Sequence, residues 1–132
     1  MNDFSLHPQL AADCHQLGTR EGCRVLLHHN ASLPWYILVP ETTAAELHEL
    51  TGSERHHLDA VMDDLARFVK THHASERVKI AAIGNRVPQL HVHVVGRHEG
   101  DPCWPEPVWG NLPAGPAWSQ NDIETLRQLL EL

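Results

Sequence analysis

The chain has 132 residues, of which 42% are apolar, and a formal net charge of −7. A chain of this length matches one domain and buries roughly two-thirds of its unfolded surface, so we expect a single domain over residues 1–132. The acidic balance without a run of Lys or Arg argues against binding of a nucleic acid polymer, and no stretch approaches the ~18 apolar residues of a membrane span.

The N-terminal third predicts one short helix followed by strands. Pro8 suits a first helical position, and Leu6, Leu10 and Cys14 recur at four-residue spacing, which is typical of one helical face. A strand is possible over 15–22, and better strands are predicted over Cys23–His29 and Trp35–Val39, the second stopped by Pro40.

Two helix starts are predicted next. Thr43 and Glu46 fit a capping box, in which the hydroxyl and the carboxylate satisfy backbone N–H groups, so a short helix should run to about Leu50. A longer helix should begin at Ser53. Its apolar residues recur at three- and four-residue spacing, which predicts packing on a sheet; they are Leu58, Val61, Met62, Leu65, Phe68 and Val69.

The remainder predicts two strands, an irregular loop and a final helix. The strands are expected over 78–83 and 89–97, with Gly84-Asn85 as the turn between them. Residues 101–116 are too rich in proline for regular structure. Ser119 should begin a helix with Ile123, Leu126, Leu129 and Leu130 directed inward. The fold class is therefore predicted as α+β, a mainly antiparallel meander of about five strands with one long helix across one face.

The cysteines and the N-terminus indicate the compartment. Cys14, Cys23 and Cys103 form an odd, widely spaced set without a CxxC pair, which argues against a disulfide framework and predicts buried or incidental thiols. The first ten residues lack the basic and apolar regions of a signal peptide. A cytoplasmic protein is expected.

The candidate site is the strand Gln89-Leu-His-Val-His-Val-Val95. Side chains alternate between the faces of a strand, so Gln89, His91 and His93 should share one face while the apolar residues between them enter the core. Same-face neighbours lie about 6–7 Å apart, so both imidazoles can reach one phosphate group. An exposed polar face without a function is the plain alternative for a bare His-x-His pattern.

Residues 84–97, Gly-Asn-Arg-Val-Pro-Gln-Leu-His-Val-His-Val-Val-Gly-Arg, resemble the signature of the histidine triad (HIT) family. The segment Leu26–Asn30, the strand 35–40 and the long helix also follow the order of that family, so the resemblance covers roughly residues 20–110. It is closest to a bacterial branch with Pro-Trp before the apolar strand and Trp-Pro after the motif. The resemblance implies one HIT-like domain.

The resemblance also implies an activity. Family enzymes hydrolyse or transfer nucleotidyl groups at the α-phosphorus of dinucleoside polyphosphates, nucleoside phosphoramidates or similar nucleotides. The position of the nucleophile is His91 here, and His93 would bind phosphate oxygens. The backbone carbonyl at Gln89 would hold the His91 proton, and water would hydrolyse the nucleotidyl-histidine intermediate.

Two positions depart from the family pattern. Gln89 stands where the first histidine is expected, and it can form hydrogen bonds but cannot titrate, which leaves the turnover rate open. Trp35 stands where many members carry a histidine in the active-site network. His28, His29 and Asn30 are candidates to replace it in part.

The substrate-binding candidates are Asn85, Asn30, His29, Arg97 and Trp104. The family implies phosphate or ribose contacts for Asn85 and a ribose contact for Asn30, although both also suit turns. Arg97 is a candidate cation for phosphate or a partner for an acidic neighbour, and Trp104 and Trp109 are candidates for a site wall, a dimer surface or ordinary burial. The expected partner is a small nucleotide, with no cofactor and no metal ion, and the family resemblance implies a homodimer.

Two other classes remain open from the sequence. A non-catalytic nucleotide-binding protein would retain the pocket and lose efficient chemistry through Gln89. A metal-binding module would use His91, His93 and either His28 or His29 as imidazole ligands.

Overall fold

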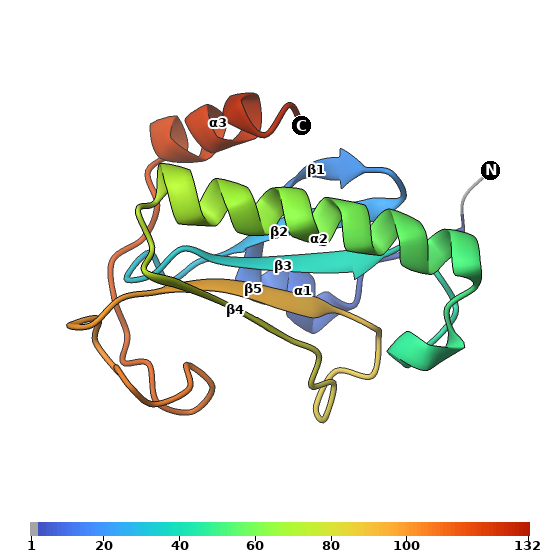
Figure 1. The fold of residues 1–132 in the computed structure, drawn as a ribbon, viewed down its shortest axis with the longest axis horizontal. Helices are drawn as coiled ribbons and strands as arrows, with labels where there is room; N and C mark the ends of the chain where they lie inside the picture. The colour runs from blue at the N-terminus through green and yellow to red at the C-terminus, as the bar shows by residue number, and fades with distance from the viewer. Residues whose placement is uncertain (1–2) are drawn as a thin grey trace.

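The computed structural model describes residues 3–132 as one α+β unit with five strands (Figure 1). Its helices are α1 (Pro8–Asp13), α2 (Gly52–His72) and α3 (Gln120–Leu129), with a 3-10 helix at Leu47–Glu49. Its strands are β1 (Cys14–Arg20), β2 (Cys23–His28), β3 (Trp35–Pro40), β4 (Arg77–Ala81) and β5 (Val92–Arg97).

The strands form one sheet in the order β1-β2-β3-β5-β4, and every neighbouring pair is antiparallel. This confirms the predicted α+β class and the antiparallel sheet. The predicted meander is corrected at one place, because β5 lies between β3 and β4. Helix α2 carries the chain from β3 past that place to the outer edge, and β5 then pairs with both strands.

The sheet is covered on both faces, and α2 and α1 lie on opposite sides of it (Figure 1). On the α2 side, alternate strand residues such as Val25, Tyr36 and Val94 pack with helix residues such as Leu58 and Val69. On the other side, the strands pack with α1 and with the loop after β5; this cluster includes Leu26, Trp35, Ile37, Val95, Leu10 and Val108. The candidate site residue His93, which pairs with Ile37, lies on this second side.

The helix starts differ from the prediction in one case. Thr51 caps α2 by accepting the N–H of Glu54, whose carboxylate accepts the N–H of Thr51 in return. The box predicted at Thr43 is absent, because Glu46 caps the short 3-10 helix instead, in a reciprocal pair with Glu49. The predicted apolar face of α2 is confirmed, because Leu58, Val61, Leu65 and Val69 are buried.

Three further predictions can be compared with the structure. The three cysteines are free and buried, as predicted. Leu129 was expected to point inward but is 51% exposed, while Ile123, Leu126 and Leu130 are buried. The last strand begins at Val92 rather than at residue 89, because its pairing with β3 ends at Leu38.

Across residues 3–132, every helix is too short or too polar to traverse a bilayer.

Candidate functional site

A cavity of about 880 Å³ opens on the side of the sheet opposite α2. Its walls come from distant parts of the chain: the N-terminal segment with α1, the ends of β2 and β3, the turn 83–87, the start of β5, and the loop around Trp109. Register explains why the sheet contributes a continuous floor. Leu26 pairs with Ile37, and Ile37 pairs with His93, so their side chains point to the same face.

His91 and His93 both line this cavity, as the strand pattern predicts, with their ring centroids 5.0 Å apart. His91 is 7% exposed and its Nδ1 lies 2.7 Å from the backbone carbonyl of Gln89. A carbonyl only accepts hydrogen bonds, so Nδ1 carries the proton of the neutral ring. The lone pair of His91 is therefore on Nε2, which is the arrangement a nucleophilic imidazole needs.

His93 is held in the opposite tautomer by a different contact. The indole N–H of Trp35 lies 3.0 Å from His93 Nδ1, and an indole only donates, so Nδ1 accepts and the ring proton is on Nε2. Burial, with smaller contributions from His91 and His28, lowers the pKa of His93 from 6.5 to about 3. His93 is thus a neutral donor, held by a tryptophan where the family pattern suggested a histidine.

His28 completes this row of rings. It stacks on Trp35 with ring centroids 4.1 Å apart and an interplanar angle of 6°. Its Nδ1 accepts the backbone N–H of Asn30. Burial lowers the pKa of His28, and the nearby Asp13 carboxylate opposes that shift. Of the two neighbouring histidines proposed from sequence, His28 is therefore the one that lies beside Trp35.

Gln89 contributes to the site mainly through its backbone. Its carbonyl orients His91, while its side-chain amide turns to the N-terminal segment, accepting the N–H of His7 at 2.8 Å and donating to the carbonyl of Ser5 at 3.0 Å. The shared face predicted for Gln89, His91 and His93 thus holds for the two histidines, and the glutamine amide faces another part of the chain.

The two predicted asparagines lie along the cavity, but their states differ. Asn30 Oδ1 accepts the N–H of Ser32 and its Nδ2 donates to the carbonyl of Pro113, so this amide braces two loops. Asn85 is exposed in the turn that follows Gly84, whose φ of +66° suits glycine. Asn85 therefore has the freer amide for a ligand.

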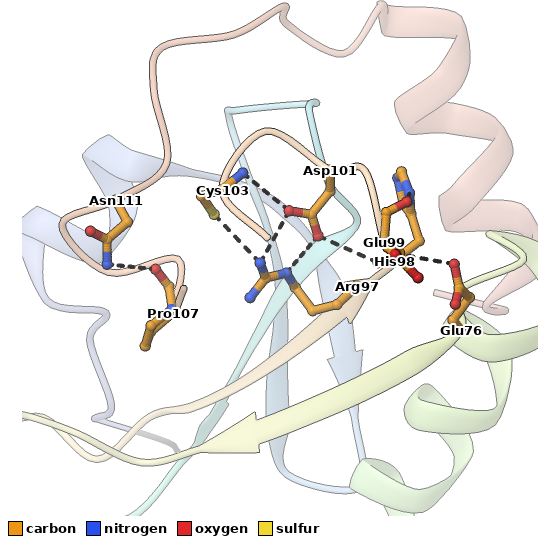
Figure 2. A network of polar contacts seen from close by, with 8 residues as sticks. All are labelled: Glu76, Arg97, His98, Glu99, Asp101, Cys103, Pro107 and Asn111. Carbon is orange, nitrogen blue, oxygen red and sulfur yellow. Dashed lines mark hydrogen bonds and ion pairs between the residues drawn. The ribbon is translucent and has the colours of Figure 1, made fainter. Parts of the chain in front are cut away.

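Three residues predicted to bind substrate do not line the cavity: His29, Arg97 and Trp104. His29 follows the last residue of β2, and its Nδ1 lies 3.0 Å from His15 Nε2. Arg97 is 5% exposed and forms a two-bond ion pair with Asp101, as Figure 2 shows. Trp104 packs with this guanidinium, which lies 5.7 Å from its ring centroid. Contacts at and after the end of β5 thus occupy Arg97 and Trp104.

Other residues take the places that these were expected to fill. Trp109 packs edge-on against His93, with centroids 5.0 Å apart, and forms the wall that the Pro- and Trp-rich segment was expected to supply. Arg86 and Asp13 also line the cavity and were not predicted. Arg86 follows Asn85 in the same turn, so sequence offered a signal for it. Asp13 lies at the end of α1, far from the motif in sequence, so no local pattern pointed to it.

The described residues, 3–132, contain no group of three or more His, Cys, Asp or Glu side chains arranged to hold a metal ion. The imidazoles of His93 and His28 are engaged as acceptors by Trp35 and by the N–H of Asn30, respectively. The cavity is thus built for hydrogen bonding.

The neutral, buried state of His93 predicts a loss of stability in acid. The unfolded chain binds a proton near pH 6.5, but the folded chain does not protonate His93 until about pH 3. The free energy of unfolding should therefore fall as the pH drops, by about 1.4 kcal/mol from this residue between pH 7.5 and 5.5. Urea unfolding at the two pH values measures this slope.

The control for this prediction is His93→Asn, which cannot titrate. Burial lowers the pKa of His73 to about 4, so His73 adds to the slope in both proteins and cancels in the comparison. In the variant, the free energy of unfolding should change less with pH, by the amount that His93 contributes. An equal slope in the two proteins would contradict the prediction.

Comparisons with known proteins agree with this geometry. The family model for the HIT domain matches residues 9–100. A histidine triad protein from Sinorhizobium meliloti is 37% identical, with a TM-score of 0.91 over 99% of this chain and 97% of that one. One from Marinobacter aquaeolei is 37% identical, with a TM-score of 0.88 over 97% and 93%. One from Bradyrhizobium japonicum is 33% identical, with a TM-score of 0.89 over 97% and 96%.

No curated protein matches the chain. The family model covers more than half of the residues, and the three solved structures share both sequence and fold over nearly the full length of each chain. The chain belongs to the histidine triad (HIT) family.

Proposed function

We propose that this protein is a nucleotide hydrolase or nucleotidyl transferase that acts at the α-phosphorus through a covalent nucleotidyl-histidine. The substrate class is a dinucleoside polyphosphate or a nucleoside phosphoramidate. The observation that carries the proposal is the 2.7 Å contact between His91 Nδ1 and the Gln89 carbonyl, which leaves Nε2 unprotonated at the cavity. In this reading the chain retains a nucleophile although Gln89 stands at the first triad position of its branch.

The chemistry follows from that tautomer. His91 Nε2 attacks the α-phosphorus, and the bond from phosphorus to the leaving group breaks; the leaving group takes the electron pair and a proton from solvent. A water molecule, or an acceptor alcohol in transfer, then attacks the same phosphorus. The electron pair of the N–P bond returns to Nε2, and the proton of the attacking oxygen passes to solvent. The Gln89 carbonyl holds the Nδ1 proton throughout.

His93 supports the charge that develops on phosphorus. Its Nε2–H is a neutral donor in a buried setting, where a hydrogen bond to a phosphate oxygen is stronger than in water. Arg86 supplies positive charge from the turn, and Asn85 supplies an amide for phosphate or ribose. The Asn30 amide already bonds Ser32 and Pro113, and it offers the ligand the hydrogen-bonding positions that these two bonds leave open.

One assay tests the proposal. The protein is incubated with a radiolabelled adenosine phosphoramidate or dinucleoside polyphosphate, and AMP release and an acid-labile protein adduct are measured. Both are expected. Tight AMP binding without turnover across the panel would instead support the second candidate, a non-catalytic binding protein, which the lack of a titratable side chain at Gln89 favours.

Trp35→Phe tests the tautomer of His93. Phenylalanine preserves the ring that stacks on His28 and removes the N–H that His93 Nδ1 accepts. We expect kcat to fall about tenfold, because the Nε2–H tautomer is no longer enforced and a buried acceptor loses its partner. The matched control is Trp118→Phe, which removes an indole N–H bound to the His28 carbonyl outside the cavity. Equal effects of both variants on kcat would contradict the assignment.

We further propose a homodimer joined at the edge of the sheet. Strand β4 is an edge strand, and Ile80 and Ile83, in and just after it, are 46% and 43% exposed. Exposed edges with apolar side chains favour pairing with another strand. Sedimentation should give twice the monomer mass at micromolar concentration, and Ile80→Lys should lower it. A monomer for the unmodified chain would overturn this proposal.

A further inference from the structure

The side-chain amide of Gln89 holds a segment that is remote in the chain. Its Oε1 accepts the N–H of His7 and its Nε2 donates to the carbonyl of Ser5, at 2.8 and 3.0 Å. These two partners are two residues apart on one extended stretch, so the amide pairs with the segment as a strand residue pairs with its neighbour. Both bonds span more than 80 residues of sequence.

The segment so held continues directly into a wall of the cavity. His7 is the N-cap of α1, where its Nδ1 accepts the N–H of Gln9 and its carbonyl accepts the N–H of Ala11. The side chains of His7, Gln9 and Asp13 line the cavity, and Leu10 also packs into the core beneath. The position of residue 7 therefore sets where this wall begins.

Short helices are weak alone, and α1 has six residues. Its place against the sheet depends on Leu10 and on the anchor before it. The carbonyl of Gln89 meanwhile orients His91, so one residue contacts both the nucleophile and the wall that faces it. The backbone does the first task and the side chain the second.

We propose that Gln89 is a positioning residue whose amide latches residues 5–7 and thereby fixes α1 as a ligand-selecting wall of the nucleotide cavity. This rests on the proposed function of the same cavity. It assigns a role to the side chain that departs from the family pattern: the amide acts through the N-terminal segment and does not touch the ligand. It follows that the N-terminal segment belongs to the binding site.

The latch itself is tested by amide hydrogen exchange in the ligand-free protein. Gln89→Met preserves side-chain length and removes both hydrogen bonds. We expect the His7 amide to exchange about tenfold faster or more, since it loses its acceptor and the segment loses both bonds. Gln9→Met is the matched control, because the Gln9 amide binds Asp13 within α1 and not the segment before it. Unchanged exchange at His7 in Gln89→Met would overturn the latch.

The role in ligand binding is tested by a double-mutant cycle with AMP as the probe. Gln89→Met and deletion of residues 2–7 should each weaken AMP binding about tenfold, and KM for a turned-over substrate should rise more than kcat falls. In the deletion background, Gln89→Met should add no further loss, because its partners are gone. Additive losses would show that Gln89 contacts the ligand directly and would overturn its assignment as a positioning residue.

The two proposals fail in different ways. Absence of AMP binding by the unmodified protein would count against the nucleotide function, and the His7 exchange would still decide whether the latch exists. Normal AMP binding and turnover combined with full His7 protection in Gln89→Met would leave the nucleotide function intact and remove the latch.

Discussion

His91→Ala should abolish the covalent adduct and lower kcat by about 1,000-fold or more, because it removes the unprotonated Nε2 that we propose as the attacking atom. His93 is close, but its Nδ1 accepts the Trp35 N–H and its Nε2 carries the proton. AMP affinity should change much less than kcat, since the walls of the cavity remain. Adduct trapping with a radiolabelled nucleotide and single-turnover kinetics measure both quantities.

The matched control is His57→Ala, which removes an exposed imidazole from α2 on the opposite side of the sheet. Its kcat and adduct yield should equal those of the unmodified protein. His91→Asn, which keeps a polar group of similar width, checks that the loss comes from the missing nucleophile and not from misfolding. Substantial turnover in both His91 variants would rule out His91 as the attacking group.

Asp101→Asn should be the most damaging single substitution of a charged residue for stability. Asp101 has a fully buried side chain that accepts two bonds from the Arg97 guanidinium, which is 7% exposed at the side chain (Figure 2). The pKa of Asp101 lies below its usual range; burial acts against that shift, and the bonds from Arg97 and from the N–H groups of Cys103 and His98 outweigh it. Neutralising Asp101 leaves a buried cation without its partner, at a cost of about 3–5 kcal/mol.

Urea unfolding measures this cost, and the chain offers a matched pair. Arg55 and Asp59 have the same i,i+4 spacing on α2, but their side chains are 47% and 49% exposed. Asp59→Asn should change the free energy of unfolding by less than about 1 kcal/mol. The double variant Arg97→Met, Asp101→Leu should recover the part of the loss that comes from the unpaired guanidinium, because it removes both charges, while the N–H groups of Cys103 and His98 still lose their acceptor. Similar losses for Asp59→Asn and Asp101→Asn would contradict the prediction.

The elements were predictable where one short-range pattern governs them. Helix α2 shows its buried face at three- and four-residue spacing, and β3 is a continuous apolar run because both faces of the sheet are covered. The alternation of side chains between the two faces of a strand predicted that His91 and His93 share one face. It also held a signal for His28, which shares its parity with buried Leu26 and therefore faces the cavity, whereas His29 follows the end of the strand.

The remaining site residues depend on contacts that spacing does not encode. The partners of Gln89 lie 82 and 84 residues away, so its side chain could not be assigned from the motif. The sequence left two roles for Arg97, a phosphate ligand or a partner of an acidic neighbour, and it could not decide between them because it does not show that Asp101 is buried beside the strand end. Trp109, rather than Trp104, reaches His93 because the path of a proline-rich loop is set by packing.

The origin of the cavity walls bears on how such a site can diversify. The family match ends at residue 100, and it begins at residue 9. His91 and His93 lie within those limits, whereas His7, Trp109 and Leu112, which all line the cavity, lie beyond them. The two histidines proposed to react thus lie within the matched region, just before and within β5, while flanking chain supplies part of the cavity wall. Exchange of residues 3–8 and 101–116 between relatives should transfer substrate preference while leaving the phosphorus chemistry in place.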